Sequence, residues 1–167
     1  MNFHVGDPVM HWTCGFGHVV GIEERILSDK KILYYAVKVR DLTVWVPIDD
    51  QVESRLRAPT SADEFKNLFD ILTGTGEPLP DNRQERKIQL VERLKDGQAK
   101  SLCRVLRDLA YYQRVHSLNE TDQNLMKRTR EALLGEWGFA LSISTFEAEL
   151  KLRHMLTPVT SGEPSTL

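Results

Sequence analysis

Hydrophobic and polar positions follow two different patterns in the two parts of the chain. Up to about residue 60, short apolar runs rich in β-branched and aromatic residues are separated by glycine, proline and short polar segments, which is typical of strands. The runs cover residues 9–12, 16–26, 32–39 and 42–46. Pro47 ends the last run, because proline has no N–H to donate to a ladder. The absence of a helical pattern between the runs predicts a small antiparallel barrel.

From residue 61 onward, apolar positions recur every three or four residues, as in amphipathic helices. We expect a short helix after Ser61 and longer ones at about 83–95, 98–115, 118–140 and 145–156. Three Ser-x-x-Glu capping boxes, beginning at Ser61, Ser117 and Ser144, indicate where helices start. Residues 73–80 contain two glycines and two prolines, so they predict a break in regular structure.

The two patterns predict an α+β fold with two domains, a small Tudor- or SH3-like antiparallel barrel followed by an all-helical domain. The expected division is a barrel at 1–60, a short helix and hinge at 61–80, a helical domain at 81–156 and a mobile tail at 157–167.

Composition favours a soluble globular protein, with 41% hydrophobic and 28% charged residues. No apolar run approaches the roughly 18 residues that span a bilayer, so we expect no membrane partner. The first residues show neither the basic nor the apolar segment of a secretory signal. We therefore expect a cytoplasmic protein whose two cysteines, Cys14 and Cys103, are reduced thiols.

Few residues suggest catalysis or metal binding. His11, Cys14 and His18 are spaced like metal ligands, but a closed zinc site needs four ligands and no fourth lies nearby in the sequence. Side chains that line the barrel are the favoured alternative. The chain has no phosphate loop, no nucleophile elbow and no His-Glu-x-x-His motif. We expect no enzyme activity, no metal, no cofactor and no small-molecule substrate.

The charge distribution points to an anionic partner. Residues 81–114 contain nine basic and five acidic residues, although the net charge of the chain is −2. One face of the expected helix at 98–115 combines Lys100, Arg104, Arg107, Tyr111 and Arg114. Basic side chains about one turn apart suit contacts with nucleic-acid phosphates, and Arg86 and Lys87 would extend the patch. The alternative is a solvated helix in which Asp108 partly neutralises Arg104.

A series of short motifs occurs in a fixed order. The motifs are Phe3-His4-Val5-Gly6-Asp7-Pro8-Val9, Gly15-Phe16-Gly17, Ile22-Glu23, Tyr34-Tyr35, Leu42-Thr43-Val44-Trp45-Val46-Pro47, Arg55-Leu56-Arg57, Leu94-Lys95-Asp96-Gly97, Val105-Leu106-Arg107-Asp108-Leu109, Leu118-Asn119-Glu120 and Ala132-Leu133-Leu134-Gly135-Glu136. In this order, over about residues 3–150, the chain resembles the CarD/CdnL family of bacterial transcription regulators.

The resemblance implies a non-enzymatic regulator of transcription initiation. Its barrel would dock on the β subunit of RNA polymerase by sheet pairing, and its helical domain would contact promoter DNA at the upstream edge of the melted region. The polymerase-binding positions implied are Arg25, Leu42, Thr43, Val44, Trp45, Val46 and Pro47. The DNA-binding positions expected are Arg83, Arg86, Lys87, Lys100, Arg104, Arg107, Tyr111 and Arg114.

The chain departs from the family pattern at two positions. Trp45 stands where some members have arginine, so the polymerase contact would be more apolar here. Members typically have a tryptophan wedge for the minor groove just before the first basic residues of the helical domain, but Asn82 or Arg83 takes its place here. Arg83 would enter a narrow minor groove by charge, whereas we expect Trp137 in the core. The main alternative is an adaptor whose helices bind a second protein instead of DNA.

Overall fold

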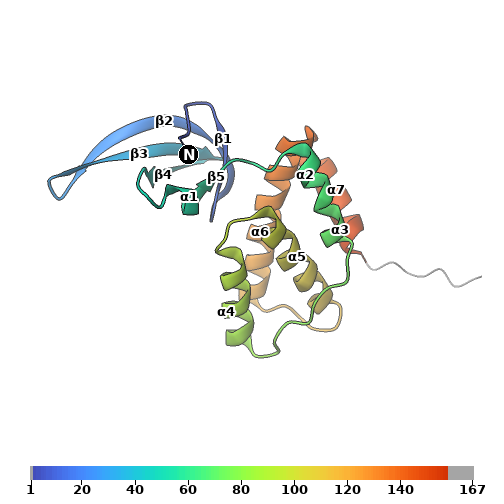
Figure 1. Ribbon diagram of the computed structural model, residues 1–167. Coiled ribbons are helices and arrows are strands. Elements are labelled where there is room, and N and C mark those ends of the chain that lie inside the picture. Colours follow the sequence, from blue (N-terminus) through green and yellow to red (C-terminus); the bar gives the residue numbers. More distant parts are fainter. Residues whose placement is uncertain (1, 158–167) are drawn as a thin grey trace, which may run out of the picture.

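The computed structural model describes residues 2–157, which form a sheet followed by a bundle of helices (Figure 1). The strands are β1 (Pro8–His11), β2 (Gly15–Leu27), β3 (Lys30–Val39), β4 (Leu42–Pro47) and β5 (Leu56–Arg57). The helices are α1 (Val52–Arg55), α2 (Ala62–Asn67), α3 (Phe69–Leu72), α4 (Arg83–Leu94), α5 (Ala99–Gln113), α6 (Glu120–Leu141) and α7 (Thr145–Leu156). The α+β arrangement predicted from the sequence is confirmed. All but the first residue of the tail expected at 157–167 lie outside the described residues.

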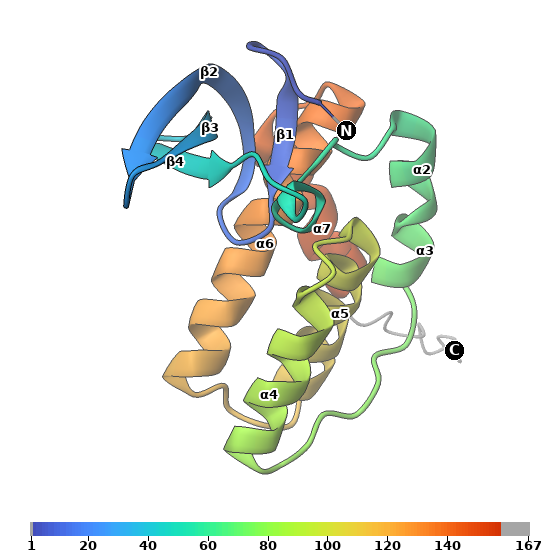
Figure 2. The same cartoon turned by 60° about the vertical axis from the view of Figure 1, so that its left-hand side comes forward.

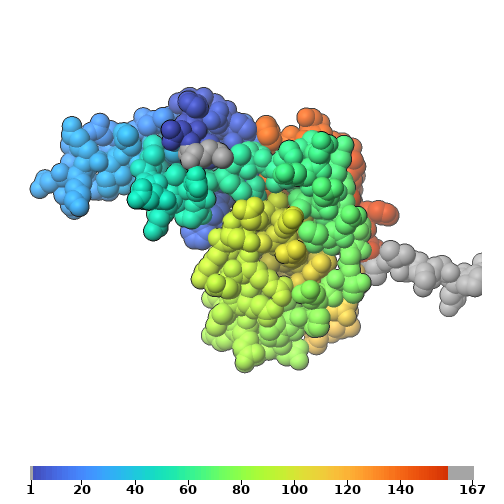
Figure 3. Space-filling model, in the orientation of Figure 1, coloured from blue at the N-terminus to red at the C-terminus, as the bar shows by residue number. Residues whose placement is uncertain are grey.

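The five strands form one antiparallel sheet in the order β4-β3-β2-β1-β5. Long strands β2 and β3 are curved in the ribbon view (Figure 1), and their far ends project away from the helices, as the space-filling view also shows (Figure 3). Gly17 permits a close approach of β2 to β3, because a Cβ there would lie 2.4 Å from the backbone oxygen of Lys38. The sheet encloses its own core around Val9, Val37 and Val46.

The helical half has a second core, around the fully buried Trp137. The Trp137 ring lies 5.6 Å from that of Phe65 and 5.0 Å from that of Phe69, which come from α2 and α3. Leu79, beyond the glycines and prolines of the predicted hinge, is buried in the same core. Apolar residues of the 61–80 segment therefore pack with the helical half, because the apolar stripe of the short helices needs burial.

Two of the three predicted capping boxes lie at helix starts. The side chain of Ser61 accepts a hydrogen bond from the Glu64 amide, and that of Ser144 accepts one from the Glu147 amide. The box predicted at Ser117 is wrong. Helix α6 begins two residues later, where Asn119 accepts from the Asp122 amide and the Asp122 carboxylate accepts from the Asn119 amide.

A buried ion pair fastens the two halves together. Arg57 of β5 donates two hydrogen bonds, of 2.6 and 2.9 Å, to the Glu136 carboxylate on α6. Glu136 has no exposed side-chain surface and also accepts from the amide and hydroxyl of Thr60. The β1–β2 turn lies against α6 in both views (Figures 1 and 2), where the rings of Phe16 and Phe139 are 5.1 Å apart.

Candidate nucleic-acid and protein interfaces

Strand β4 is an edge of the sheet, and within residues 2–157 no strand pairs with its outer side. The Ile48 amide donates to the Leu33 oxygen at 2.9 Å, so Ile48 and Leu33 form a hydrogen-bonded pair at the end of the β3–β4 ladder. This pair shows which of the other β3–β4 pairs are hydrogen-bonded. Because bonded and non-bonded pairs alternate in an antiparallel ladder, every second residue of β4 turns its backbone groups away from β3. These residues are Thr43, Trp45 and Pro47. The edge thus offers backbone groups for strand addition.

An exposed cluster covers the outer face of the sheet beside this edge. The Trp45 indole, which is 39% exposed, donates to the Glu23 carboxylate at 2.9 Å. The Arg25 guanidinium lies 4.5 Å from the Trp45 ring centroid and 3.5 Å from Glu23. The structure therefore brings together Arg25 and Trp45, which are 20 positions apart in the sequence.

The other predicted polymerase-binding residues divide between the two faces of β4. Val46 is buried in the sheet core and Val44 packs against it, so their side chains are not offered to a partner. Leu42 is exposed at the start of the strand. The side chain that the edge presents best is that of Trp45.

The predicted basic stripe on α5 is interrupted. Lys100 and Arg104 are exposed near the start of the helix. The Arg107 side chain is only 14% exposed and donates to the Asp108 carboxylate at 2.9 Å. Asp108 is fully buried and also accepts from Arg93 at 2.7 Å. The alternative in which Asp108 neutralises Arg104 is therefore wrong, because Asp108 faces the interior.

A strap formed by residues 73–80 crosses the second half of the stripe. A Cβ on Gly76 would lie 2.3 Å from the Cβ of Tyr111, which shows how closely the strap covers α5. The Glu77 amide donates to Asp108 at 2.9 Å and holds the strap in place. Tyr111 remains partly exposed, with the Arg114 guanidinium 5.7 Å from its ring centroid. The Arg114 guanidinium also donates to the Leu156 carbonyl at 3.3 Å.

Arg86 does not lie on the surface. Its side chain is 3% exposed and donates to both oxygens of the Asp122 carboxylate, at 3.0 and 2.8 Å. It also donates to the Pro80 and Asp81 carbonyls and to the Tyr112 hydroxyl. The hydrogen bond to Asp122 raises the pKa of the Arg86 guanidinium. The prediction that Arg86 contacts DNA needs correction, because every one of these partners is internal.

The start of α4 presents the remaining basic candidates. Asn82 caps the helix by accepting from the amides of Gln84 and Glu85, so its side chain is occupied. Arg83 and Lys87 follow and are exposed. Because α5 turns back along α4 (Figure 2), this pair and the Lys100–Arg104 pair lie at opposite ends of a helix about 18 Å long.

Comparison with known proteins decides the family. The model of the CarD C-terminal domain matches residues 67–153, which run from the end of α2 into α7 and cover more than half of the chain. The chain belongs to the CarD family. It is also 26% identical, over 137 residues, to "Putative transcription factor YdeB" of Bacillus subtilis strain 168, an alignment that covers 80% of this chain and 89% of that protein.

The CarD family consists of transcription factors that are generally not enzymes. The part of this chain that the family model matches is the helical half. The part of the chain that the structure describes contains no group of three or more histidine, cysteine, aspartate or glutamate side chains placed to hold a metal. His11 accepts, at Nδ1, from the amides of Thr13 and Cys14. Among residues 2–157, no helix is long and apolar enough to cross a membrane.

Two parts of these candidate interfaces were not predicted from the sequence pattern. The network around Asp108 joins α4, α5 and the strap, and the hydrogen bond from Trp45 to Glu23 joins two strands that are not neighbours in the sheet. The acidic residue inside the apolar stripe of α5 was the available signal for the first. No local pattern indicated the second, since it depends on the sheet register.

Proposed function

We propose that this CarD-family protein is a non-enzymatic regulator of transcription initiation that acts in the bacterial cytoplasm. Its sheet would bind the RNA polymerase β subunit by adding a strand to the edge of β4, and its helical half would contact promoter DNA. The observation that carries the proposal is the outward-facing backbone of Thr43 and Trp45 at an edge that no strand of residues 2–157 covers. Arg25 and Trp45 would then contact the partner through their side chains.

The edge is tested with one residue changed in two ways. Thr43→Pro removes an outward N–H, while an edge strand tolerates the proline. Thr43→Val keeps the N–H and serves as the matched control. We expect Thr43→Pro to weaken binding to the isolated β subunit by about tenfold, the cost of one lost backbone hydrogen bond whose acceptor is left unpaired, and Thr43→Val to change it little. Equal affinity of the two variants would exclude strand addition.

The proposed DNA contacts are those basic side chains that remain exposed. They are Arg83, Lys87, Lys100 and Arg104, with Tyr111 and Arg114 at the margin. Arg86 and Arg107 are left out because both are held in internal ion pairs. Arg83, the first residue of α4, would enter the minor groove by charge in place of an apolar wedge. If these contacts are made more fully in the open than in the closed promoter complex, they would stabilise the open complex. The stabilisation would equal the difference in binding free energy between the open and closed complexes.

The DNA contact is tested by charge reversal at the start of α4. Arg83→Glu plus Lys87→Glu should shorten open-complex lifetime and flatten the salt dependence of duplex binding, since each phosphate contact adds to the slope. Lys66→Glu, on the exposed side of α2, is the control and should leave both unchanged. An unchanged lifetime and slope in the double variant would remove these residues from the mechanism.

A protein-binding adaptor is the second candidate, and one observation favours it. Phe146 and Leu150 lie one turn apart on α7 and are 70% and 48% exposed. An apolar pair at this spacing suits a groove on a second protein. Duplex binding without salt dependence, together with loss of activity in Phe146→Ala, would support the adaptor and count against the DNA contact.

A further inference from the structure

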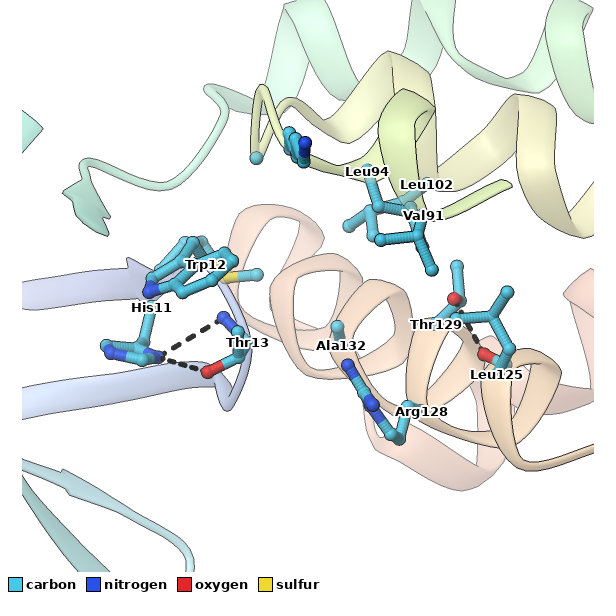
Figure 4. A pocket seen from close by; sticks show the side chains of 13 residues that line it. His11, Trp12, Thr13, Val91, Leu94, Leu102, Leu125, Arg128, Thr129 and Ala132 are labelled. Carbon is cyan, nitrogen blue, oxygen red and sulfur yellow. Dashed lines mark hydrogen bonds between the residues drawn. The ribbon is translucent and has the colours of Figure 1, made fainter. Parts of the chain in front are cut away.

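A pocket lies where the two halves of the molecule meet, away from both the β4 edge and the start of α4. Its volume is about 360 Å³, within the range of roughly 300–1,000 Å³ that is usual for small-ligand sites. Its walls come from the β1–β2 turn on one side and from α4, α5 and α6 on the other (Figure 4). No contact described above for the polymerase or for DNA uses this space.

The walls are mainly apolar. Figure 4 shows Trp12 on the side of the β1–β2 turn, facing Val91, Leu94 and Leu102 across the space. Trp12 is 50% exposed and Val91 is 41% exposed, so both leave apolar surface in water. Exposed apolar surface gathered at a concave site, and not scattered singly, marks a binding surface. The flat indole of Trp12 favours an aromatic ligand.

One cation in the pocket lacks a counter-ion. Arg128 extends from α6 toward Ala132, and within residues 2–157 no carboxylate lies within ion-pair distance of it. On the same helix, Glu131 pairs with Arg40 and Glu136 with Arg57. Both nearby acids are thus committed to arginines of the sheet half, and the Arg128 guanidinium remains available for an anion.

The other polar groups of the pocket do not change this charge. Lys95 is paired with Glu92 at 2.7 Å on the surface of α4. His11 accepts two backbone hydrogen bonds at Nδ1, which places its proton on Nε2. Burial lowers the pKa of His11, so the ring is neutral at pH 7 and adds no second cation. The pocket therefore combines an apolar body with a single unpaired positive charge.

We propose that this pocket binds a small aromatic monocarboxylate, with its ring against Trp12 and its carboxylate on Arg128. The carboxylate matches the planar guanidinium, which can donate two parallel hydrogen bonds. Because the walls belong to both halves, a bound molecule holds the sheet and the helices in one relative position. Such a molecule would act as an effector that fixes this relative position.

The probe is 1-naphthoate, titrated into the full-length protein by calorimetry, with neutral 1-naphthalenemethanol as the ligand control. We expect saturable binding of one naphthoate per chain, much weaker binding of the alcohol, and quenching of tryptophan fluorescence that Trp12→Phe abolishes. No saturation, or equal binding of acid and alcohol, would overturn the proposal.

Two variants, with a third as the control, locate the binding within the protein. Arg128→Gln should raise the dissociation constant of naphthoate at least about tenfold, whereas Lys127→Gln, the adjacent exposed lysine outside this pocket, should leave it unchanged. Val91→Trp, at a half-exposed position, fills the space and should block binding. Equal effects of the two glutamine variants, or full binding by a folded Val91→Trp, would show that naphthoate binds elsewhere. Urea unfolding confirms that each variant is folded.

Discussion

Two buried charged side chains hold the elements of the helical half together. Arg86 ties the start of α4 to Asp122 at the start of α6, and Asp108 holds α4 and the strap through Arg93 and the Glu77 amide. Removing charges from water costs several kcal/mol, which such pairs recover only when every partner is in place. These residues therefore position the exposed basic side chains at the surface while their own charges stay inside the helical half.

Arg86→Met tests this role. It leaves the Asp122 carboxylate buried without its partner, so we expect the free energy of unfolding to fall by about 3–5 kcal/mol. Lys87→Met, the next residue and exposed, should change it by less than about 0.5 kcal/mol. Urea unfolding followed by circular dichroism measures both. If both variants cost the same, Arg86 has no such structural role.

The difference between these two neighbours also shows why the basic surface was only partly predictable. Helical spacing correctly put Lys100 and Arg104 on one face, and both are exposed. The same spacing put Arg107 on that face, but the strap covers it there. Which face of a helix meets another element depends on partners far along the chain, as with Asp122 for Arg86, and local periodicity carries no such information.

At the scale of elements, helix and strand positions follow local chemistry closely. The four apolar runs predicted as strands all form strands, and Pro47 ends β4 as expected. The predicted start of α6 was wrong, because both Ser117 and Asn119 are good N-cap residues. Asn119 prevails since it allows Asp122, three residues on, to complete the capping box and to pair with Arg86.

Alanine substitutions distinguish the two possible caps of α6. Asn119→Ala removes the acceptor for the Asp122 amide and should lower the free energy of unfolding by about 1 kcal/mol. Ser117→Ala should have almost no effect, because Ser117 lies outside the helix and is exposed. Chemical unfolding of both variants measures the difference. A larger loss in Ser117→Ala would place the helix start where the capping box at Ser117 predicted it.

At the scale of the whole molecule, the relation between the halves depends on one buried carboxylate. Glu136 accepts from Arg57 and Thr60, which lie at the end of the sheet and in the link to the helices. The aromatic contact between Phe16 and Phe139 adds a second attachment one turn further along α6. The sequence indicated two halves but not this attachment, because Arg57 and Glu136 are 79 positions apart.

Glu136→Gln should loosen this attachment. We expect a loss of about 3 kcal/mol or more, because Arg57 keeps its charge at a mostly buried position without a carboxylate. Glu131→Gln breaks the exposed pair with Arg40 and should cost less than about 1 kcal/mol. Hydrogen exchange at residues 57–61, together with urea unfolding, reports both effects. Unchanged exchange in Glu136→Gln would show that apolar contacts alone hold the halves.

The separation of Arg57 from Glu136 also has a consequence for biosynthesis. A ribosome releases the sheet half first, and its domain can fold while the rest is still being translated. The carboxylate that pairs with Arg57 belongs to Glu136, which is translated 79 residues later. Until then, the nascent sheet carries an unneutralised guanidinium near the tunnel exit. The two halves can be joined by this ion pair only after the Glu136 segment of α6 has emerged, so their alignment follows the folding of the sheet.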